Sequence, residues 1–318
     1  MKFISGEDVH RLCDWQALVA ALAEGHRGPR PLTDRVGLEI EMRGGRQSYL
    51  NLPAWLPGIA MGSKLVTVIP DNPERHAGVP AIQAAYVLFG GDDGTPLAYI
   101  DGTALTYRKT AADSALGSML LSRTDPEMLL MVGAGGLSPY LARAHRAVHP
   151  SLKTVVVWNR TPRRAEAVAA ALRAQGVDAA ASDDLEAAVR LADIISCCTA
   201  STEPLVKGKW LKAGSHLDLV GAFTPDMREC DDAAVMRARL FVDARQFAID
   251  QPGDLASPLA RGIIARDDIE ADLFDLCRPG YKVGRQRDDV TLFKNGGGGH
   301  LDLMTALYIW RASGVAQT

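Results

Sequence analysis

Long apolar runs are missing from this chain of 318 residues, and so is an excess of basic residues. No stretch approaches the about 20 apolar residues with which a helix crosses a bilayer, so we expect a soluble protein. The 35 Lys and Arg residues are balanced by 38 Asp and Glu residues, which gives a net charge of −3. Nucleic acids and anionic membranes require strongly basic surfaces, so we expect small-molecule partners instead of either one.

Paired cysteine motifs are also absent. The cysteines form no Cys-x-x-Cys pair, their number is odd, and no signal-peptide pattern precedes them. Secreted domains pair their cysteines in disulfides, whereas cytosolic proteins keep them reduced. We therefore expect a cytoplasmic protein with inert thiols in its core. The five cysteines are Cys13, Cys197, Cys198, Cys230 and Cys277.

A glycine-rich loop follows an apolar run in the middle of the chain. The run Met128-Leu129-Leu130-Met131-Val132 leads directly into the loop, and a second apolar run ends at Trp158. Ser138 stands where the third glycine of a GxGxxG motif would be, but strand, loop, helix and strand follow in the order of a βαβ unit. Glycines at such a turn let backbone N–H groups approach a pyrophosphate at the start of the helix. We therefore predict a dinucleotide site that includes Gly133, Ala134, Gly135, Gly136 and Leu137.

The residues after the second apolar run bear on the choice of dinucleotide. NAD sites usually have an Asp or Glu there that binds the ribose 2′-hydroxyl. This chain has Asn159, followed by Arg160, Thr161 and Arg164. Neutral and basic side chains suit a 2′-phosphate, so the sequence favours NADP(H), with NAD(H) possible. Arginines at the start of a helix are often only solvated, so this evidence is weaker than the glycine loop.

The first hundred residues predict an α+β domain. A helical pattern at 15–25 is followed by alternating apolar runs at 36–42, 63–68 and 84–89. Gly, Pro, Asn and Asp residues separate these runs, which predicts a mostly antiparallel sheet. The glycine-rich segment 90–94 predicts a hairpin within that sheet.

The rest of the chain predicts a Rossmann-type domain. A helix at 106–122 leads into alternating strands and helices, a pattern typical of a doubly wound parallel sheet. A final helix at 301–312 follows a glycine run, and we expect it to return to the first domain. The fold class is thus α/β, with a doubly wound sheet at 116–295. The discontinuous second domain comprises 1–115 and 296–318.

Short strings spread over nearly the whole chain resemble the ornithine cyclodeaminase/mu-crystallin family in their order and spacing. They include Gly62-Ser63-Lys64, Pro70-Asp71-Asn72-Pro73, Gly78-Val79-Pro80, Thr202-Glu203-Pro204-Leu205 and Thr291-Leu292-Phe293-Lys294. The resemblance implies a Rossmann domain and a second domain that dimerises through its sheet, with the substrate site at the cleft between them. It also implies chemistry on an α-amino or α-imino acid beside a nicotinamide.

By this resemblance, Arg35, Lys64 and the basic residue of a Thr-x-x-Arg-Thr string bind the substrate carboxylate. Here Lys109 occupies the arginine position of that string, and Arg108 precedes it. Neighbours on a helix point about 100° apart, so only one of the two faces the carboxylate, and the sequence leaves the choice open. Lys64 lies in an apolar strand, where an ammonium group needs an anionic partner.

One departure from the family pattern favours an enzyme that acts on a cyclic imine over a cyclodeaminase. Cyclodeaminases resemble this chain around residue 223 but carry an aspartate that engages the substrate amine, whereas this chain has Phe223. A phenyl ring cannot accept a proton or pair with an ammonium, and a flat cyclic imine tolerates it better. Asp226 is a weaker substitute, because Asp after Pro is common in turns.

Further candidates lie at the ends of predicted elements. Asp302 opens the last helix, where it could approach the nicotinamide or simply match the helix dipole. His216 and His300 lack ligand-spaced partners, so we predict no metal site. The carboxyl ends of two strands add candidate cofactor contacts. These are Thr199, Ala200, Ser201, Val220 and Gly221.

The sequence therefore predicts a homodimeric NAD(P)H-dependent reductase that converts Δ1-pyrroline-2-carboxylate, or its six-membered homologue, to the cyclic amino acid. Arg35, Lys64 and either Arg108 or Lys109 bind the substrate, and Lys64 and Asp302 are the catalytic candidates. Two alternatives stay open: an ornithine cyclodeaminase, and a non-catalytic carrier of NADPH that resembles a crystallin.

Overall fold

The computed structural model describes residues 1–42 and 45–314, and the chain forms two compact units. Unit 1 comprises Met1–Lys109 and Gly298–Thr318, and unit 2 comprises Thr110–Gly297. The division falls inside helix α4 (Gly102–Leu121), as does the boundary predicted after residue 115. The predicted fold class, a doubly wound parallel sheet plus a discontinuous α+β domain, is confirmed.

Unit 1 is built on a seven-stranded sheet, in which β1 and β7 are parallel and the other pairs are antiparallel. The strands lie in the order β1-β7-β6-β5-β4-β2, and β3 also pairs with β4. The predicted hairpin at 90–94 joins β6 to β7. Its elements are β1 (Lys2–Ile4), α1 (Gly6–Leu12), α2 (Trp15–Arg27), β2 (Leu32–Thr33), β3 (Val36–Met42), β4 (Gly45–Leu56), β5 (Ala60–Val68), α3 (Asn72–Arg75), β6 (Ile82–Gly90), β7 (Pro96–Asp101) and α12 (Gly299–Ala312).

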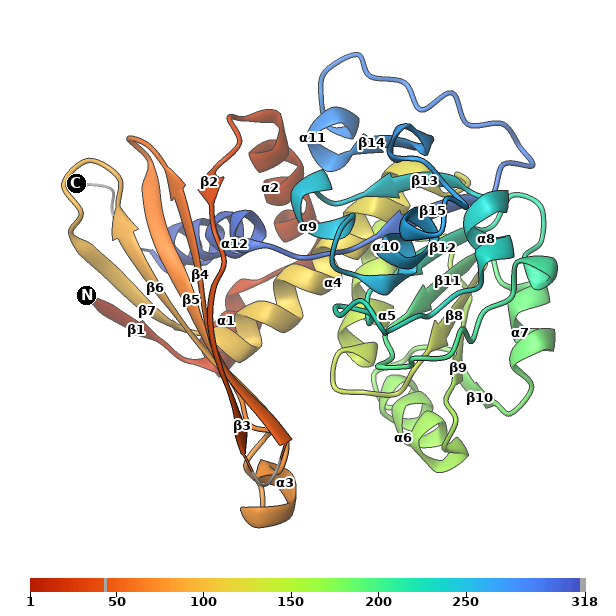
Figure 1. The fold of residues 1–318 in the computed structure, drawn as a ribbon, viewed down its shortest axis with the longest axis horizontal. Helices are drawn as coiled ribbons and strands as arrows, with labels where there is room; N and C mark the ends of the chain where they lie inside the picture. Colours follow the sequence, from red (N-terminus) through yellow and green to blue (C-terminus); the bar gives the residue numbers. More distant parts are fainter. Residues whose placement is uncertain (43–44, 315–318) are drawn as a thin grey trace. The chain divides into compact units, whose positions relative to one another are not determined.

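One face of this sheet packs against the last helix. Helix α12 contacts β4, β5 and β6 and also α2 (Figure 1). Alternate residues of the strands point to it, so Gly62, Lys64, Tyr86 and Leu88 are buried. The chain thus places a lysine and a tyrosine side by side on the apolar inner face of a sheet.

Unit 2 contains eight parallel strands in the order β10-β9-β8-β11-β12-β15-β13-β14. From β8 the chain runs outward through β9 and β10, and then crosses back to β11 on the other side of β8. Doubly wound sheets bind ligands at the carboxyl ends of strands flanking such a reversal. The elements are β8 (Met128–Val132), α5 (Ser138–Val148), β9 (Thr154–Trp158), α6 (Pro162–Arg173), β10 (Ala179–Ser182), α7 (Leu185–Leu191), β11 (Ile194–Cys197), η1 (Gly208–Trp210), β12 (His216–Leu219), α8 (Asp232–Arg237), β13 (Arg239–Val242), α9 (Arg245–Ala248), α10 (Gly253–Ala260), η2 (Arg266–Asp268), β14 (Ile269–Asp272), α11 (Leu273–Leu276) and β15 (Thr291–Lys294).

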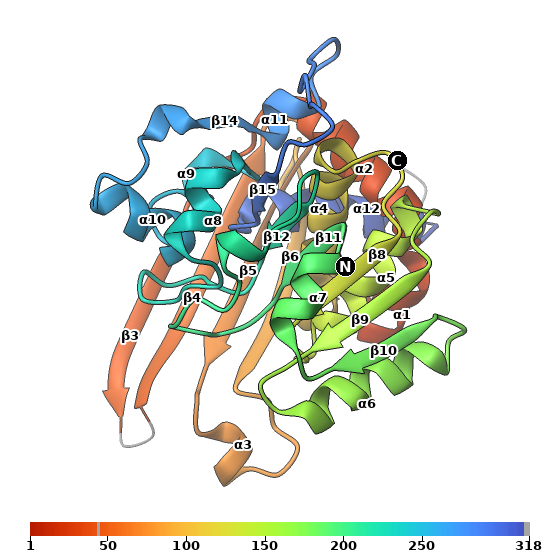
Figure 2. The ribbon, with the colours of Figure 1, turned by 90° about the vertical axis from the view of Figure 1, so that its right-hand side faces the viewer.

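Both faces of this sheet are covered by helices, as Figure 2 shows from the side. Residues of α7, α8 and α10 join one face of the strands in a continuous apolar core. On the other face, a Cβ at Gly117 of α4 would lie 2.7 Å from the ring of Phe293 in β15, so this helix packs closely on the sheet. Double coverage explains why the strands are apolar on both faces, which made them recognisable in the sequence.

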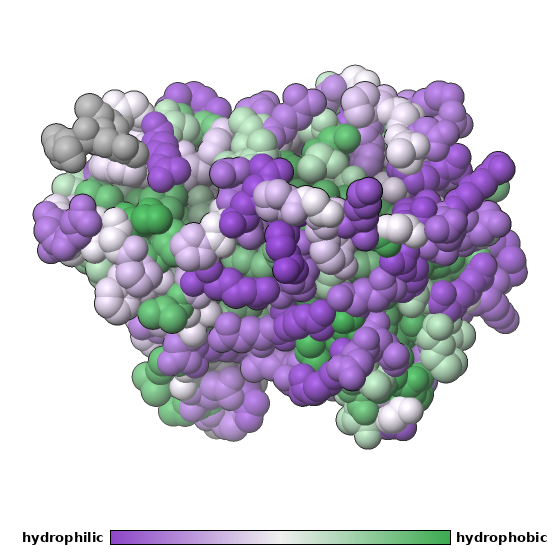
Figure 3. Space-filling model, turned by 90° about the horizontal axis from the view of Figure 1, so that it is seen from above, coloured by the Kyte–Doolittle hydropathy of each residue, from purple (hydrophilic) through white to green (hydrophobic). Residues whose placement is uncertain are grey.

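Among the described helices, none is both long and apolar enough to cross a bilayer. On the face drawn in Figure 3, hydrophilic side chains predominate and hydrophobic ones form small separate groups. Within residues 1–42 and 45–314, no three His, Cys, Asp or Glu side chains are grouped so that they could hold a metal ion.

Candidate active site

The glycine loop after β8 is shaped by two different requirements. Gly133 has a φ of +115°, and a Cβ there would lie 2.8 Å from the carbonyl oxygen of Cys198. Gly135 is exposed, and a Cβ there would meet no atom within 4 Å. The first glycine is thus required by the packing of the protein itself, whereas the second lies beside open space. No side chain caps the following helix, α5, so this loop fits the pyrophosphate of a dinucleotide.

The structure brings all the predicted nucleotide-binding residues to the carboxyl ends of four neighbouring strands. Asn159 donates a hydrogen bond from Nδ2 to the carbonyl oxygen of Thr161 at 3.1 Å and so shapes the turn after β9. Arg160, Thr161 and Arg164 are exposed around this turn. The set comprises Gly133, Ala134, Gly135, Gly136 and Leu137 after β8; Asn159, Arg160, Thr161 and Arg164 after β9; Thr199, Ala200 and Ser201 after β11; and Val220 and Gly221 after β12.

Three charged side chains meet in the interior of unit 1. Lys64 comes from β5, Lys109 from α4 and Asp302 from α12. The Nζ atom of Lys64 lies 3.0 Å from the Asp302 carboxylate, and that of Lys109 lies 3.1 Å from it. Their exposed fractions are 5%, 3% and 0%. Two ammonium groups share one carboxylate, so this lysine–aspartate cluster carries one positive charge in excess.

The three groups shift one another's ionisation. Burial lowers the pKa of Lys64 to about 8; the Asp302 carboxylate opposes this shift, and the second ammonium, Lys109, adds to it. Burial alone would raise the pKa of Asp302, but the two ammonium groups outweigh burial and hold it below its ordinary value. At neutral pH the cluster therefore keeps its excess charge. A buried charge without a counter-ion is unfavourable, so the cluster favours binding of an anion.

The two basic candidates on α4 have different surroundings. The Arg108 guanidinium donates to the carbonyl oxygens of Cys13 at 3.0 Å and His10 at 2.8 Å, and it stacks on the ring of Trp15. Arg108 thus ties α4 to the N-terminal helices, and Lys109 is the residue beside Lys64. Arg35 lies in the exposed connection between β2 and β3, outside the buried cluster.

Tyr86 is a neighbour of the cluster that the sequence interpretation missed. It is paired with Lys64 in the register of β5 and β6 and is fully buried. A Cβ at Gly62 would lie 2.3 Å from its hydroxyl, so the ring requires a glycine there. Burial and the nearby Asp302 carboxylate raise the pKa of this phenol well above its ordinary value. Only strand register brings Tyr86 and Lys64 together, and register is not visible in a single sequence.

The two residues at which the sequence was compared with the cyclodeaminase pattern lie after β12. Phe223 is 56% exposed in unit 2. The Asp226 carboxylate accepts a hydrogen bond from the Thr224 hydroxyl at 2.6 Å in the same exposed segment. This contact agrees with a turn role for Asp226.

A serine, a histidine and an aspartate form a buried chain in unit 2 that looks like a hydrolytic triad. Ser118 Oγ lies 2.9 Å from His145 Nδ1, and His145 Nε2 lies 3.3 Å from Asp218. All three side chains are inaccessible to solvent, so no substrate can reach the serine. Asp218 also accepts hydrogen bonds from Ser114 and Ser196. The chain is therefore an internal network that holds α4 and α5 on the sheet.

A family model matches nearly the whole chain. The model of the ornithine cyclodeaminase/mu-crystallin family matches residues 7–313. The chain belongs to this family. The chain has the doubly wound sheet and the discontinuous second domain that the resemblance implied, and the family membership expected from the short strings is confirmed.

Individual relatives carry reductase names. A Δ1-pyrroline-2-carboxylate reductase of Paracoccus denitrificans is 42% identical over 310 residues, which cover 98% of this chain and 96% of the relative. The solved structure of Thermococcus litoralis Δ1-pyrroline-2-carboxylate reductase, in complex with NADH and L-proline, matches with a TM-score of 0.91 at 25% identity, covering 98% of this chain and 97% of that one. The iminosuccinate reductase of Paracoccus denitrificans, in complex with NAD+, matches with a TM-score of 0.85 at 26% identity, covering 98% and 96%.

Proposed function

We propose that this protein is an NAD(P)H-dependent reductase of cyclic imino acids that converts Δ1-pyrroline-2-carboxylate to L-proline. The observation that carries the proposal is the excess positive charge of the buried lysine–aspartate cluster. A substrate carboxylate is the anion that this charge would take up. The relatives named as reductases of this imine support the choice of substrate.

Each residue of the cluster has a proposed part in binding. Lys64 and Lys109 hold the substrate carboxylate, and Asp302 fixes both ammonium groups in position and opposes the lowering of the Lys64 pKa by burial. Arg35 stays a candidate third cation. When bound, a reduced nicotinamide nucleotide would supply a hydride for C2 of the ring, and the ring nitrogen would take up one proton as the C=N bond becomes CH–NH. Orientation and electrostatics are the protein's contribution.

The glycine loop and the polar turn after β9 support a nicotinamide dinucleotide, with NADPH preferred. No acidic side chain follows β9, where an NAD site would usually have one. The exposed Arg160 and Arg164 match the charge of a 2′-phosphate. NADH remains usable under this proposal, because the glycine loop does not depend on the 2′ position.

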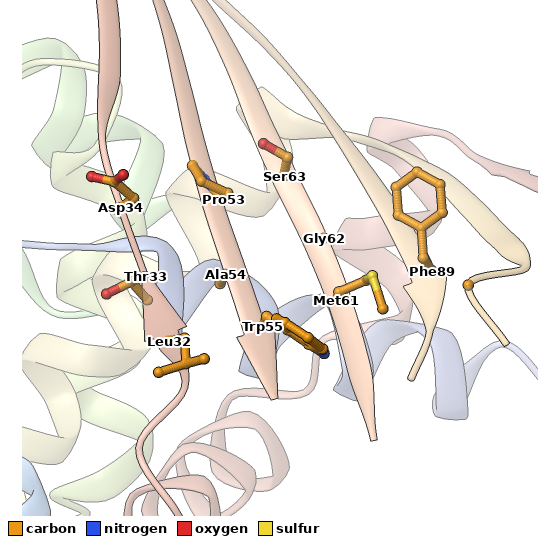
Figure 4. A pocket seen from close by; sticks show the side chains of 11 residues that line it. Leu32, Thr33, Asp34, Pro53, Ala54, Trp55, Met61, Gly62, Ser63 and Phe89 are labelled. Atoms are coloured by element: carbon orange, nitrogen blue, oxygen red, sulfur yellow. The ribbon is translucent and has the colours of Figure 1, made fainter. Parts of the chain in front are cut away.

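A homodimer through the open face of the unit 1 sheet completes the proposal. That face presents exposed apolar side chains, among them Leu38, Ile40 and Trp55. It also carries a groove of about 600 Å³ that Trp55, Met61 and Phe89 line from three strands (Figure 4). Apolar area of this kind on a sheet is typical of interfaces between subunits. Sedimentation of the purified protein tests this part directly.

Oxidation of NADPH and NADH by the purified protein, with a panel of cyclic and acyclic imino acids, tests the proposed reaction. We expect turnover with Δ1-pyrroline-2-carboxylate and a higher kcat/KM with NADPH than with NADH. Release of ammonia from L-ornithine without net oxidation of NADPH would instead identify a cyclodeaminase. Binding of NADPH without turnover of any imine or amino acid would identify a carrier.

A further inference from the structure

A buried carboxylate joins two of the nucleotide-binding loops in unit 2. Glu229 lies between β12 and α8 and has no exposed surface. Its Oε1 atom accepts hydrogen bonds from the Thr199 N–H at 2.6 Å and the Thr199 hydroxyl at 3.0 Å. Its Oε2 atom accepts from the N–H groups of Gly221 at 2.6 Å and Ala222 at 3.3 Å. One side chain therefore holds the loops after β11 and β12 together.

These two loops pack closely against each other, and the loop after β11 also packs against the glycine loop. A Cβ at Gly221 would lie 2.1 Å from the carbonyl oxygen of Thr199, so the two backbones are in direct contact. A Cβ at Gly133 would lie 3.0 Å from the Thr199 methyl group. Thr199 therefore packs against the loop that we assign to the pyrophosphate.

Glu229 is itself held by a buried ion pair. The Asp254 carboxylate accepts the Glu229 N–H at 2.7 Å and lies 3.1 Å from Nζ of Lys294. Asp254 comes from α10 and Lys294 from the end of β15, and both are fully buried. These contacts hold the Glu229 backbone while its side chain reaches the two loops.

We propose that Glu229 is a positioning residue for the nicotinamide nucleotide: it sets the distance between the loops after β11 and β12 without touching the nucleotide. The inference rests on the proposed function, because it assumes that these loops bind a nicotinamide nucleotide. Nothing in the contacts of Glu229 involves the turn after β9, so its effect is the same for NADH and NADPH.

The position requires an ionised acceptor of this length. All four bonds come from N–H or O–H donors, so a Gln side chain would point its own NH₂ group at one loop. An Asp side chain is one methylene shorter and can reach only one loop. Burial and the Asp254 carboxylate raise the pKa of Glu229, and Lys294 and the loop amides oppose them.

Mild acid should therefore weaken the link between the loops. The other titratable groups facing this carboxylate are the thiols of Cys197 and Cys198 on the β11 side and of Cys230. Burial raises the pKa of all three thiols, so they stay neutral. Protonation of Glu229 would replace an acceptor with an O–H donor and release one loop.

Direct binding of NADH and NADPH to Glu229→Gln and Glu229→Asp tests the proposal without any imine present. We expect Kd for both nucleotides to rise about tenfold in each variant, since both variants lose the hydrogen bonds to one loop. At saturating nucleotide, kcat should stay within about threefold of wild type, because no substrate contact changes. Glu203→Gln is the matched control, since Glu203 is exposed in the segment after β11.

The pH dependence separates positioning from a general loss of structure. Kd of the wild type for NADH, which lacks the titrating 2′-phosphate, should rise as pH falls from 8 to 6, and Glu229→Gln should remove this dependence. Kd values within twofold of wild type in a folded Gln variant would overturn the proposal, as would failure of both variants to fold. If the wild type binds nucleotide but reduces no imine, the proposed function fails, yet the Kd comparison still decides the role of Glu229.

Discussion

The two units each bury a cluster of three charges, and the clusters have opposite excess charge. In unit 1, Lys64 and Lys109 share the single carboxylate of Asp302. In unit 2, Asp254 and Glu229 are accompanied by the single ammonium of Lys294. The positive excess in unit 1 is left for a ligand. The negative excess in unit 2 is taken up by backbone N–H groups.

The two clusters differ in whether the chain itself supplies partners for the excess charge. The carboxylate of Glu229 has four donors from its own chain and needs no ligand. The lysine–aspartate cluster has no second carboxylate among the residues that the structure describes within ion-pair distance of its ammonium groups. An internally satisfied cluster needs no ligand, whereas an unbalanced one favours binding of an ion of opposite charge.

Replacing Lys64 should produce the largest effect. Lys64→Met keeps the volume of the side chain but removes one ammonium, so the cluster loses its excess charge. We expect kcat/KM for the imine to fall by at least about a hundredfold, as when one partner of a buried charge pair is removed. Lys153→Met is the control, because Lys153 is on the surface with 71% of its side chain exposed. Equal activity of Lys64→Met and wild type would show that the carboxylate binds elsewhere.

Variants of Lys109 and Arg108, neighbours on α4, should differ in whether they change substrate binding or stability. Lys109→Met should lower kcat/KM about thirtyfold, since Lys109 shares the cluster. Arg108→Met should leave kcat/KM nearly unchanged and lower Tm, because its guanidinium bonds link α4 to Cys13 and His10. Steady-state kinetics and thermal unfolding of both variants check this pair. A reversed result, with activity lost in Arg108→Met alone, would reassign the third cation.

Asp302→Asn should shift the pH profile of kcat/KM, and its effect should be smaller than those of the lysine variants. Lys64 must be protonated to bind a carboxylate, and burial lowers its pKa to about 8. Log kcat/KM should therefore be level below pH 8 and fall above it in the wild type. Without the Asp302 charge, the pKa of Lys64 falls further. The descending limb of the profile should then lie about one pH unit lower than in the wild type. An unchanged limb would show that Asp302 does not act on the charge of Lys64.

Much of the fold could be predicted because each element carries its own periodic signal. The strands Met128–Val132 and Thr154–Trp158 are short apolar runs with glycine or polar residues after them, and their predicted ends are confirmed. Strand β15 was missed, since four residues that end in Lys294 give no such signal. Its place in the middle of the sheet is set by pairing with β12 and β13, far away in the sequence.

The candidate site could be predicted only in part, because some of its contacts also join residues that are far apart in the sequence. Lys64 was recognisable as a charge in an apolar strand, and the glycine loop by its spacing. The choice between Arg108 and Lys109 depends on the rotation of α4 against β5 and α12, which one sequence does not fix. Glu229 was not among the predicted site residues, because its four donors come from loops about 8 and 30 residues away.

The smallest effect concerns two buried histidines of unit 2: His149, whose Nε2 lies 3.1 Å from Ser118 Oγ, and His216, whose Nδ1 lies 2.9 Å from the Thr291 hydroxyl. Burial lowers the pKa of His149 to about 4 and that of His216 to about 3. The unfolded chain binds protons at these positions near pH 6.5 and the folded chain does not, so stability is retained above pH 6.5 and lost as pH falls below it. Each histidine should add about 1.4 kcal/mol per pH unit to this slope. Urea unfolding between pH 7 and 5 should show a shallower slope for His149→Gln than for wild type, and equal slopes would contradict the assignment.

Comparison of two imines that differ only in the carboxylate tests the central claim most directly. Wild type and Lys64→Met are each assayed with Δ1-pyrroline-2-carboxylate and with Δ1-pyrroline, which has the same ring and no carboxylate. If the excess charge of the lysine–aspartate cluster binds the substrate carboxylate, the wild type prefers the first imine by at least about a hundredfold and Lys64→Met loses that preference. Equal kcat/KM for the two imines in the wild type, or an undiminished preference in Lys64→Met, would contradict the account.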